Sequence, residues 1–173
     1  MHSAIFIQRK KWNSLTKHEF VRNAIVKGLH EYMGILVIES STIGNMPPYP
    51  FITYTITSPY LGIGYMEDYY EEENNRIQNR HVQHYERVFS FTIVANDVDE
   101  AMNRCMQAMQ YFKCDGVWEL KDKNIVIVEV NSATTRDTFI TIDYERRYGF
   151  DVRIRLCEEE ARETENIIET VIL

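Results

Sequence analysis

The sequence predicts a single α+β domain over residues 1–173, in which a mostly antiparallel sheet carries two main helices on one face. Three observations lead to this prediction. The chain has 173 residues, of which 45% are hydrophobic and 26% charged, a size and composition typical of one globular domain with its own core. Two amphipathic helical patterns stand far apart in the chain. Each is followed by several consecutive strand patterns, and this order is typical of an antiparallel α+β sheet.

The first helix is expected to begin at Thr16 and to end before Gly34. Thr16 and Glu19 have the spacing of a capping box, in which each side chain accepts a hydrogen bond from a free backbone N–H of the first turn. Gly34 can take the left-handed conformation that ends many helices. One apolar stripe connects the two ends. It consists of Phe20, Val21, Ala24, Ile25, Gly28, Leu29, Tyr32 and Met33.

Two strands are expected between the first helix and the middle of the chain. Residues 35–39 form a short apolar run, which indicates a buried strand. Residues 51–57 alternate apolar residues with threonines, which indicates a half-buried strand. The segment Met46–Pro50 between them contains three prolines and cannot lie in a central strand, because proline has no N–H to donate.

The second helix is predicted to begin after Asp97, which forms another capping box with Glu100. Its apolar stripe is read as core, since methionine on a helix far more often fills a core than lines a cofactor site. The stripe consists of Val98, Ala101, Met102, Cys105, Met106, Met109 and Phe112. A strand is expected before this helix and four after it. They are Arg87–Ala95, Val117–Leu120, Ile125–Val130, Thr138–Glu145 and Phe150–Leu156.

The last two of these strands are expected to form a hairpin whose turn lies at Arg146–Gly149, with Gly149 at positive φ. Alternation in the second strand separates a core face from a polar face. The core face holds Phe150, Val152, Ile154 and Leu156, and the polar face holds Asp151, Arg153 and Arg155. Guanidinium groups in a row suit carboxylates of a neighbouring subunit, whereas a plain solvated face is an equal alternative.

Two segments fit less well into a compact core. Gly62–Tyr85 is rich in Tyr and Glu, has no clear periodicity, and is expected to be a functional loop or a long protruding hairpin. Residues 158–173 are expected to form a strand-like C-terminal arm that begins with an acidic run and ends in Ile167-Ile-Glu-Thr-Val-Ile-Leu173. This arm could pair within its own sheet or with an edge of another subunit.

Charge and composition exclude several classes of protein. The formal net charge of −7 argues against a protein that binds nucleic acid by neutralising phosphates, but it fits a passage through which DNA slides without sticking. The three cysteines lack metal-ligand spacing and indicate reduced thiols. No apolar run is long enough to span a membrane, and the N-terminus has its charges after its apolar residues, the reverse of a signal peptide.

Candidate catalytic and metal-binding motifs are weak. Asp115, Glu119 and Lys121 resemble the acid and Glu-x-Lys pattern of Mg²⁺-dependent nucleases, but the first acid normally lies on a separate strand. His81 and His84 could share one helical face for zinc, yet no third ligand has motif spacing. Nothing positive favours a small-ligand binding module. We therefore expect no enzyme activity and no cofactor.

Three pieces of the sequence, in this order, resemble the neck or tail terminator proteins of long-tailed bacteriophages, most closely the group found in phages of Gram-positive bacteria. They are the proline-marked strand Pro47–Tyr54, the strand that leads through Asn96-Asp97 into the second helix, and the run Tyr144–Arg155. The resemblance spans roughly Leu15 to Leu156. It is weakest over Gly62–Tyr85.

The resemblance implies a structural virion protein that is assembled in the host cytoplasm. Such proteins form a ring, usually a hexamer, on the head-proximal end of the tail tube. The ring ends tube polymerisation and docks to the head connector, and double-stranded DNA passes through its lumen without specific binding. The implied partners are further copies of the chain, the tail tube protein and a head-completion or connector protein. A head-completion or connector ring of the same neck is the alternative.

A ring needs two different complementary surfaces on each subunit. The candidate contact residues come from the predicted hairpin, the acidic run near residue 71 and the C-terminal tail. They are Arg146, Arg147, Tyr148, Phe150, Asp151, Arg153, Arg155, Glu71, Glu72, Glu73, Ile167, Ile168 and Val171.

Overall fold

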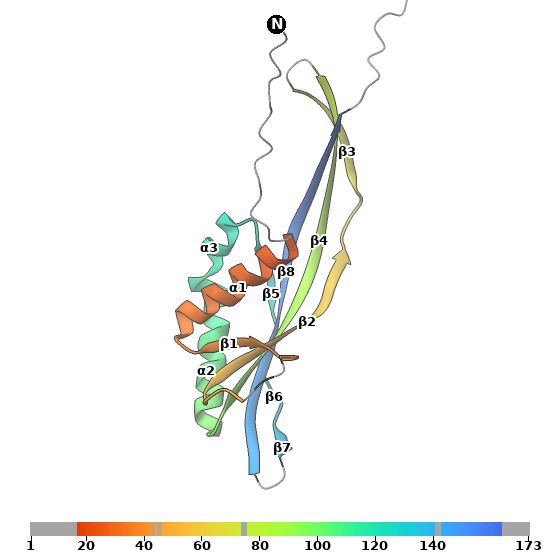
Figure 1. The fold of residues 1–173 in the computed structure, drawn as a ribbon. Helices are drawn as coiled ribbons and strands as arrows, with labels where there is room; N and C mark the ends of the chain where they lie inside the picture. Colours follow the sequence, from red (N-terminus) through yellow and green to blue (C-terminus); the bar gives the residue numbers. More distant parts are fainter. Residues whose placement is uncertain (1–16, 43, 45, 74–75, 141–142, 164–173) are drawn as a thin grey trace, which may run out of the picture.

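A computed structural model describes residues 17–42, 44, 46–73, 76–140 and 143–163 of the chain. It confirms a single α+β domain with a layer of helices on one face of a twisted sheet (Figure 1). The elements run in the following order along the chain. They are α1 (Lys17–Met33), β1 (Leu36–Glu39), β2 (Phe51–Gly62), β3 (Glu67–Glu73), β4 (Arg76–Ala95), α2 (Val98–Gln110), a π-helical turn (Tyr111–Asp115), α3 (Val117–Asp122), β5 (Val126–Val130), β6 (Thr134–Thr135), β7 (Thr138–Ile140) and β8 (Asp143–Glu163).

The sheet is mostly antiparallel, as predicted. Its main strand order is β1-β2-β4-β8-β5. Among the described strands, only β1 and β2 pair in parallel, whereas β4 pairs antiparallel with both β2 and β8. The short strands attach to these long ones, since β3 pairs with β4, and β6 and β7 pair with β8. The two long central strands therefore organise the whole molecule.

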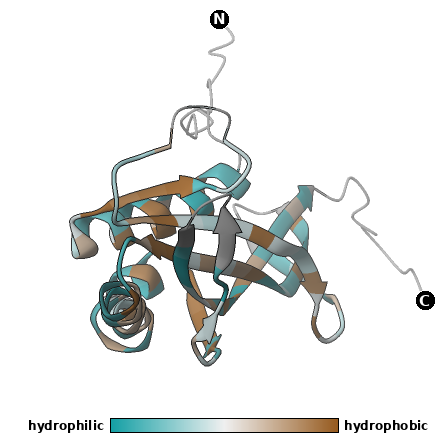
Figure 2. Ribbon diagram, turned by 90° about the horizontal axis from the view of Figure 1, so that it is seen from below, coloured by the Kyte–Doolittle hydropathy of each residue, from teal (hydrophilic) through white to brown (hydrophobic). Residues whose placement is uncertain are grey.

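The core lies between the helices and the sheet. Phe91 on β4 forms its centre, with ring centroids 5.1 Å from Phe112 and 5.7 Å from Phe150. Hydrophobic and hydrophilic positions are interleaved along the strands, as Figure 2 shows. The predicted core face of the last strand is confirmed, because Phe150, Val152, Ile154 and Leu156 are all buried.

Both helix boundaries predicted from glycine and aspartate are confirmed. Gly34 follows α1 with a φ of 67° and its amide donates to the carbonyl of His30 at 2.9 Å. The Asp97 carboxylate accepts a hydrogen bond from the Glu100 amide at 3.1 Å, which caps α2. The other predicted cap, Thr16, lies outside the described residues.

The predicted turn at Arg146–Gly149 is wrong. Those residues lie inside β8, where Arg146 pairs with Ala95 and Gly149 pairs with Thr92 of β4. The chain reverses earlier, because β7 pairs Thr138 with Glu145 and Ile140 with Asp143. The φ angle of Gly149 is not positive, so this residue has the ordinary extended backbone of a strand. Alternation continues through these positions, and pairing with β4 decides in favour of one continuous strand.

The predicted strand at Val117–Leu120 is also wrong, since these residues form α3. The Leu120 amide donates to the carbonyl of Gly116 at 3.0 Å, and the Leu120 side chain is fully buried in the core. Four residues, of which three are apolar, are too few for their pattern to distinguish a buried helical turn from a strand.

The Gly62–Tyr85 segment forms a protruding hairpin, which was one of its two predicted alternatives. Residues 67–73 of β3 pair with residues 76–82 of β4. On the other side, residues 78–83 of β4 pair with residues 158–163 of β8, so the acidic run lies within its own sheet. We call this three-stranded extension, residues 63–83 and 157–163, the arm. It projects beyond the helices (Figure 1).

Candidate interaction surfaces

The predicted arginine row lies on the sheet face opposite the helices and has carboxylate partners in its own chain. Arg155 Nη2 lies 3.0 Å from Glu86 Oε1 on β4, and Arg153 Nη2 lies 2.8 Å from Glu129 Oε2 on β5. Arg153 Nη1 also approaches Glu86 Oε2 at 3.8 Å. Glu86 is only 6% exposed, so its charge depends on these two guanidinium groups.

This pairing changes what the arginine row can offer to a partner. The side chains of Arg153 and Arg155 are 42% and 47% exposed, so each keeps donors that face solvent. Their charge is already balanced by Glu86 and Glu129, two residues that sequence patterns did not single out. A subunit contact at Arg153 and Arg155 stays a prediction.

Asp151 belongs to a second network, centred on Arg136, a residue that no sequence pattern singled out. Arg136 Nη2 lies 3.0 Å from Asp151 Oδ1, and its Nη1 donates to the hydroxyls of Ser90 at 2.7 Å and Thr92 at 3.0 Å. The guanidinium crosses β8 at Gly149, where an added Cβ would lie 2.6 Å from Arg136 Nε. The Arg136 amide also donates to the carbonyl of Arg147 at 2.7 Å, beside β6.

The first four candidate residues of the predicted hairpin have separate environments. Arg146 Nη1 lies 3.4 Å from Asp137 Oδ2, and Arg147 pairs with the buried carboxylate of Glu145. Tyr148 is partly buried against the core. Phe150 is 1% exposed in the core, which leaves it no surface for a subunit contact and removes it from the candidates.

Glu145 has a further partner that connects the proline segment to β8. The Tyr49 hydroxyl donates to Glu145 Oε1 at 2.8 Å, and the Tyr49 ring stacks on Phe51 at 5.6 Å. The peptide bond between Tyr49 and Pro50 is cis. Burial and the hydrogen bond to Glu145 both raise the pKa of Tyr49, so this hydroxyl stays a donor at neutral pH.

The arm carries the second group of candidates. Arg80 on β4 joins three strands, because it lies 2.6 Å from Glu71 on β3 and 2.5 Å from Glu159 on β8. Glu72 and Glu73 complete β3, which places them at the tip of the arm. The tail candidates Ile167, Ile168 and Val171 lie outside the described residues.

Large exposed apolar side chains gather on the arm and at its base. The most exposed are Tyr65 at 96% and Tyr70 at 69%. The full set is Tyr60, Leu61, Tyr65, Met66, Tyr69, Tyr70 and Ile77. Apolar side chains exposed close together are typical of interaction surfaces. They lie on both faces of the arm, because Tyr69 and Tyr70 are neighbours on β3 and point to opposite sides of the sheet.

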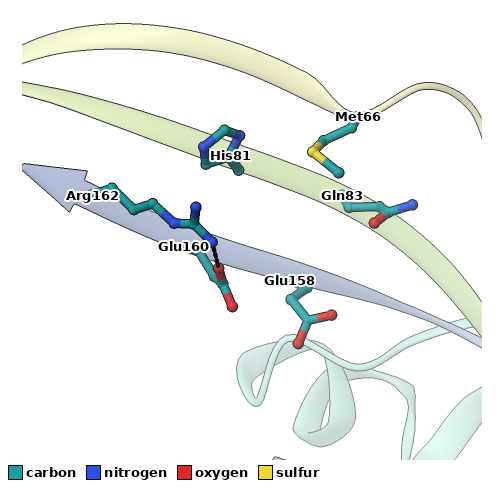
Figure 3. A pocket seen from close by; sticks show the side chains of 6 residues that line it. All are labelled: Met66, His81, Gln83, Glu158, Glu160 and Arg162. Carbon is teal, nitrogen blue, oxygen red and sulfur yellow. Dashed lines mark ion pairs between the residues drawn. The ribbon is translucent and has the colours of Figure 1, made fainter. Parts of the chain in front are cut away.

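A shallow concavity of about 390 Å³ lies on the arm. Figure 3 shows its lining, with Met66 before β3, His81 and Gln83 on β4, and acidic residues on β8. The lining residues are Met66, His81, Gln83, Glu158, Glu160 and Arg162. His81 Nδ1 is paired with Asp68, and Arg162 Nη2 lies 3.6 Å from Glu160 Oε2.

The structure does not assemble the nuclease pattern considered from the sequence. Asp115 Oδ2 accepts a hydrogen bond from the Tyr32 hydroxyl at 2.8 Å, and Glu119 Oε1 lies 2.6 Å from Lys123. Lys121 lies over the Trp118 ring at 5.2 Å from its centroid. Each group of the pattern thus has a different neighbour.

The two histidines considered for zinc are not on a helix. His81 and His84 lie on β4, and a spacing of three in a strand places them on opposite faces. Among the residues that the structure describes, no cluster of three His, Cys, Asp or Glu side chains could hold a metal ion. Of the helices in this part of the chain, none is long and apolar enough to cross a membrane.

Comparison with protein families gives a match over most of the chain. The family model for phage neck terminator proteins matches residues 23–172, a range that includes most of α1, all of α2 and α3, the arm and the whole of β8. None of the curated proteins compared with the chain matches it.

Proposed function

The chain belongs to the phage neck terminator protein family, and from that membership we propose that it closes into a ring, a hexamer, at the head-proximal end of the tail tube. A phage neck protein is a structural component of the virion that contacts other head and tail proteins. In our proposal the ring is assembled in the host cytoplasm, ends polymerisation of the tube, and presents a surface to the head connector. The family match leaves the host group open, and an origin in phages of Gram-positive bacteria stays a prediction.

The observation that supports a ring most directly is the aromatic surface of the arm. A closed ring of identical subunits requires two unlike surfaces that contact each other head to tail. The arm is one such surface, because it projects from the domain and exposes Tyr65 and Tyr70. The helix layer is a second, with Met106 60% and Trp118 70% exposed. Tyrosine and tryptophan are the residues that most often dominate binding energy at interfaces.

The test is the mass of the purified protein measured by light scattering, alone and after incubation with tail tubes. We expect a closed oligomer, in solution or on the tube ends. Tyr65→Ser combined with Tyr70→Ser should weaken self-association by about 30- to 1,000-fold, the effect of losing two interface anchors of roughly 1–2 kcal/mol each. Met46→Ser, which removes an exposed apolar side chain that lies outside both the arm and the helices, is the matched control.

Two results would contradict parts of the proposal. A protein that remains a single chain on tube ends is not a ring. A ring that binds connectors but leaves tube length unchanged is a head-completion protein rather than a terminator. Tube length is measured by electron microscopy after polymerisation with and without the protein.

Charge reversal of the arginine row is a poor test of a subunit contact. Arg153→Glu with Arg155→Glu would remove both partners of Glu86 and add two like charges beside its buried carboxylate. An uncompensated buried charge costs several kcal/mol, so this variant should unfold before its interface can be examined. Arg153→Gln alone, which keeps the Arg155–Glu86 pair, is the better variant.

A further inference from the structure

The arm has a sheet face that the described residues leave uncovered. On β4, His81 and Gln83 alternate onto the same face as Tyr85 and Phe89, which are buried in the core. The helices cover that face only up to the base of the arm (Figure 1). Beyond it, the same face forms the concavity around Glu158 and Glu160 (Figure 3).

The start of α1 is fixed at the base of this uncovered face. Lys17 Nζ donates to the carbonyl of Cys157 at 2.6 Å, and Cys157 directly precedes Glu158 on β8. The described part of the chain therefore begins beside the concavity. An extended chain spans at most about 3.3–3.6 Å per residue, so Lys10 can reach roughly 23 Å from Lys17, ample for the ~10 Å between Cys157 and Glu160.

The chemistry of residues 1–16 complements that of the concavity. The segment contains Arg9, Lys10 and Lys11 and no Asp or Glu. The concavity presents Glu158 and Glu160, and Glu160 has a basic neighbour, Arg162, at 3.6 Å. The apolar run Ala4–Ile7 precedes the basic residues, and Met66 offers an exposed apolar side chain in the same concavity.

A buried donor at the base of the arm supports the same placement. Arg87 lies on β4 and is 6% exposed, and its Nη1 has no hydrogen-bond partner among the described residues. Its charge lowers the pKa of His18, after the larger effect of burial, which places Arg87 beside the first turn of α1. A carbonyl of the chain that precedes Lys17 would satisfy this donor.

We propose that the N-terminal segment Met1–Thr16 docks along the helix-side face of its own chain's arm, with Arg9–Lys11 against Glu158 and Glu160 and with Ala4–Ile7 over Met66. The partner of this surface is thus a basic, apolar-ended segment of the same chain. The proposal does not depend on ring formation.

Fluorescence of Trp12 tests the docking. The chain has two tryptophans, so Trp118→Phe leaves Trp12 as the only reporter in the full-length protein. We expect acrylamide to quench docked Trp12 weakly. Glu158→Gln with Glu160→Gln should raise the quenching constant at least twofold, and so should Arg9→Gln with Lys10→Gln and Lys11→Gln. Both sets together should add nothing further, because they break one contact.

Glu159→Gln is the matched control, because it removes one carboxylate from the same strand but on the face that Arg80 occupies. It should leave Trp12 quenching unchanged. The proposal is overturned if acrylamide quenches Trp12 equally in all variants. It is also overturned if acrylamide quenches Trp12 strongly in the Trp118→Phe protein that carries no other substitution.

A cross-link separates docking within the chain from docking on a neighbour. With Cys114→Ser and Cys157→Ser removing the exposed thiols, Gln8→Cys with Gln83→Cys should form an intrachain disulfide that keeps single-chain mobility on a denaturing gel. Gln8→Cys with Gln78→Cys is the control, since Gln78 lies on the opposite face of β4. Interchain dimers, or equal linkage at both positions, overturn the proposal.

Discussion

At the scale of single residues, Gly149 shows how a glycine can suggest a turn where the chain continues as a strand. Glycine between two alternating runs predicted a tight turn, but Gly149 lies in the middle of β8 and pairs with Thr92. Its missing side chain leaves room for the Arg136 guanidinium, whose Nε, Cδ and Cζ would lie 2.6, 2.7 and 2.7 Å from an added Cβ. Glycine in a strand interior often marks such a close approach, although the sequence does not say of what.

Gly149→Ala should therefore lower the free energy of unfolding by roughly 1–2 kcal/mol, because Arg136 must leave its hydrogen bonds to Ser90, Thr92 and Asp151. In an Arg136→Ala background, the same change should be neutral or should stabilise by about 0.5–1 kcal/mol, since alanine suits a strand better than glycine. Urea denaturation of the four proteins measures the coupling. Simple additivity of the two substitutions would contradict the role of Gly149 as space for Arg136.

At the scale of elements, the contact between α1 and the π-helical turn depends on two glycines. The ring of Tyr111 lies between them, since an added Cβ would lie 2.1 Å from its Oη at Gly28 and 2.3 Å from its Cε2 at Gly116. Tyr32 adds a tilted ring at 5.3 Å. Burial raises the pKa of Tyr111 to about 12, and its hydroxyl is without a hydrogen-bond partner among the described residues. The helices thus pack around a polar group that gains nothing from burial.

Gly28→Ala should lower the free energy of unfolding by about 1–3 kcal/mol through overpacking. In an unobstructed helix the same substitution would raise it by about 1 kcal/mol, so the sign of the change is the test. Tyr111→Phe should stabilise by roughly 1 kcal/mol, because it removes an unsatisfied buried hydroxyl. It should also rescue most of the Gly28→Ala loss, as chemical denaturation will show. A stabilising Gly28→Ala would mean that α1 does not pack on Tyr111 as described.

Elements whose ends are set by a few neighbouring residues could be predicted from the sequence. Elements that depend on pairing with residues far away in the chain could not. The Asp97 cap and the Gly34 stop depend on a few neighbouring residues, and both are confirmed. Whether residues 146–149 turn or continue depends on pairing with β4, some fifty residues away in the chain. The partners of Arg153 and Arg155 come from two other strands for the same reason, so their chemistry was predicted but their neighbours were not.

At the scale of the whole molecule, several of the described positive groups on the sheet are matched by carboxylates of the same chain. The net charge is −7, and the partly exposed guanidinium groups of Arg80, Arg153 and Arg155 each have a carboxylate within 3.0 Å. Affinity for nucleic acid depends on cations that can replace the counterions of phosphates. A wall built from such subunits would let DNA pass without holding it.

We therefore expect no saturable binding of duplex DNA at 150 mM salt, with any dissociation constant weaker than about 0.1 mM, the upper end of ordinary non-specific binding. Fluorescence anisotropy of a labelled duplex measures this. Binding at micromolar protein concentration would contradict the charge argument. It would also require a basic surface outside the residues described.

The two long strands have a mechanical consequence. β4 has 20 residues and β8 has 21, and their ladder runs without interruption from Gln78 and Glu163 on the arm to Ala95 and Arg146 below the core. A force on the tip of the arm is therefore carried by the same hydrogen bonds that hold Phe91 against Phe150. Because the ladder has no break between the arm and the core, we expect the arm and the core sheet to move together. A displacement of the tip of the arm would then tilt the core sheet beneath the helices.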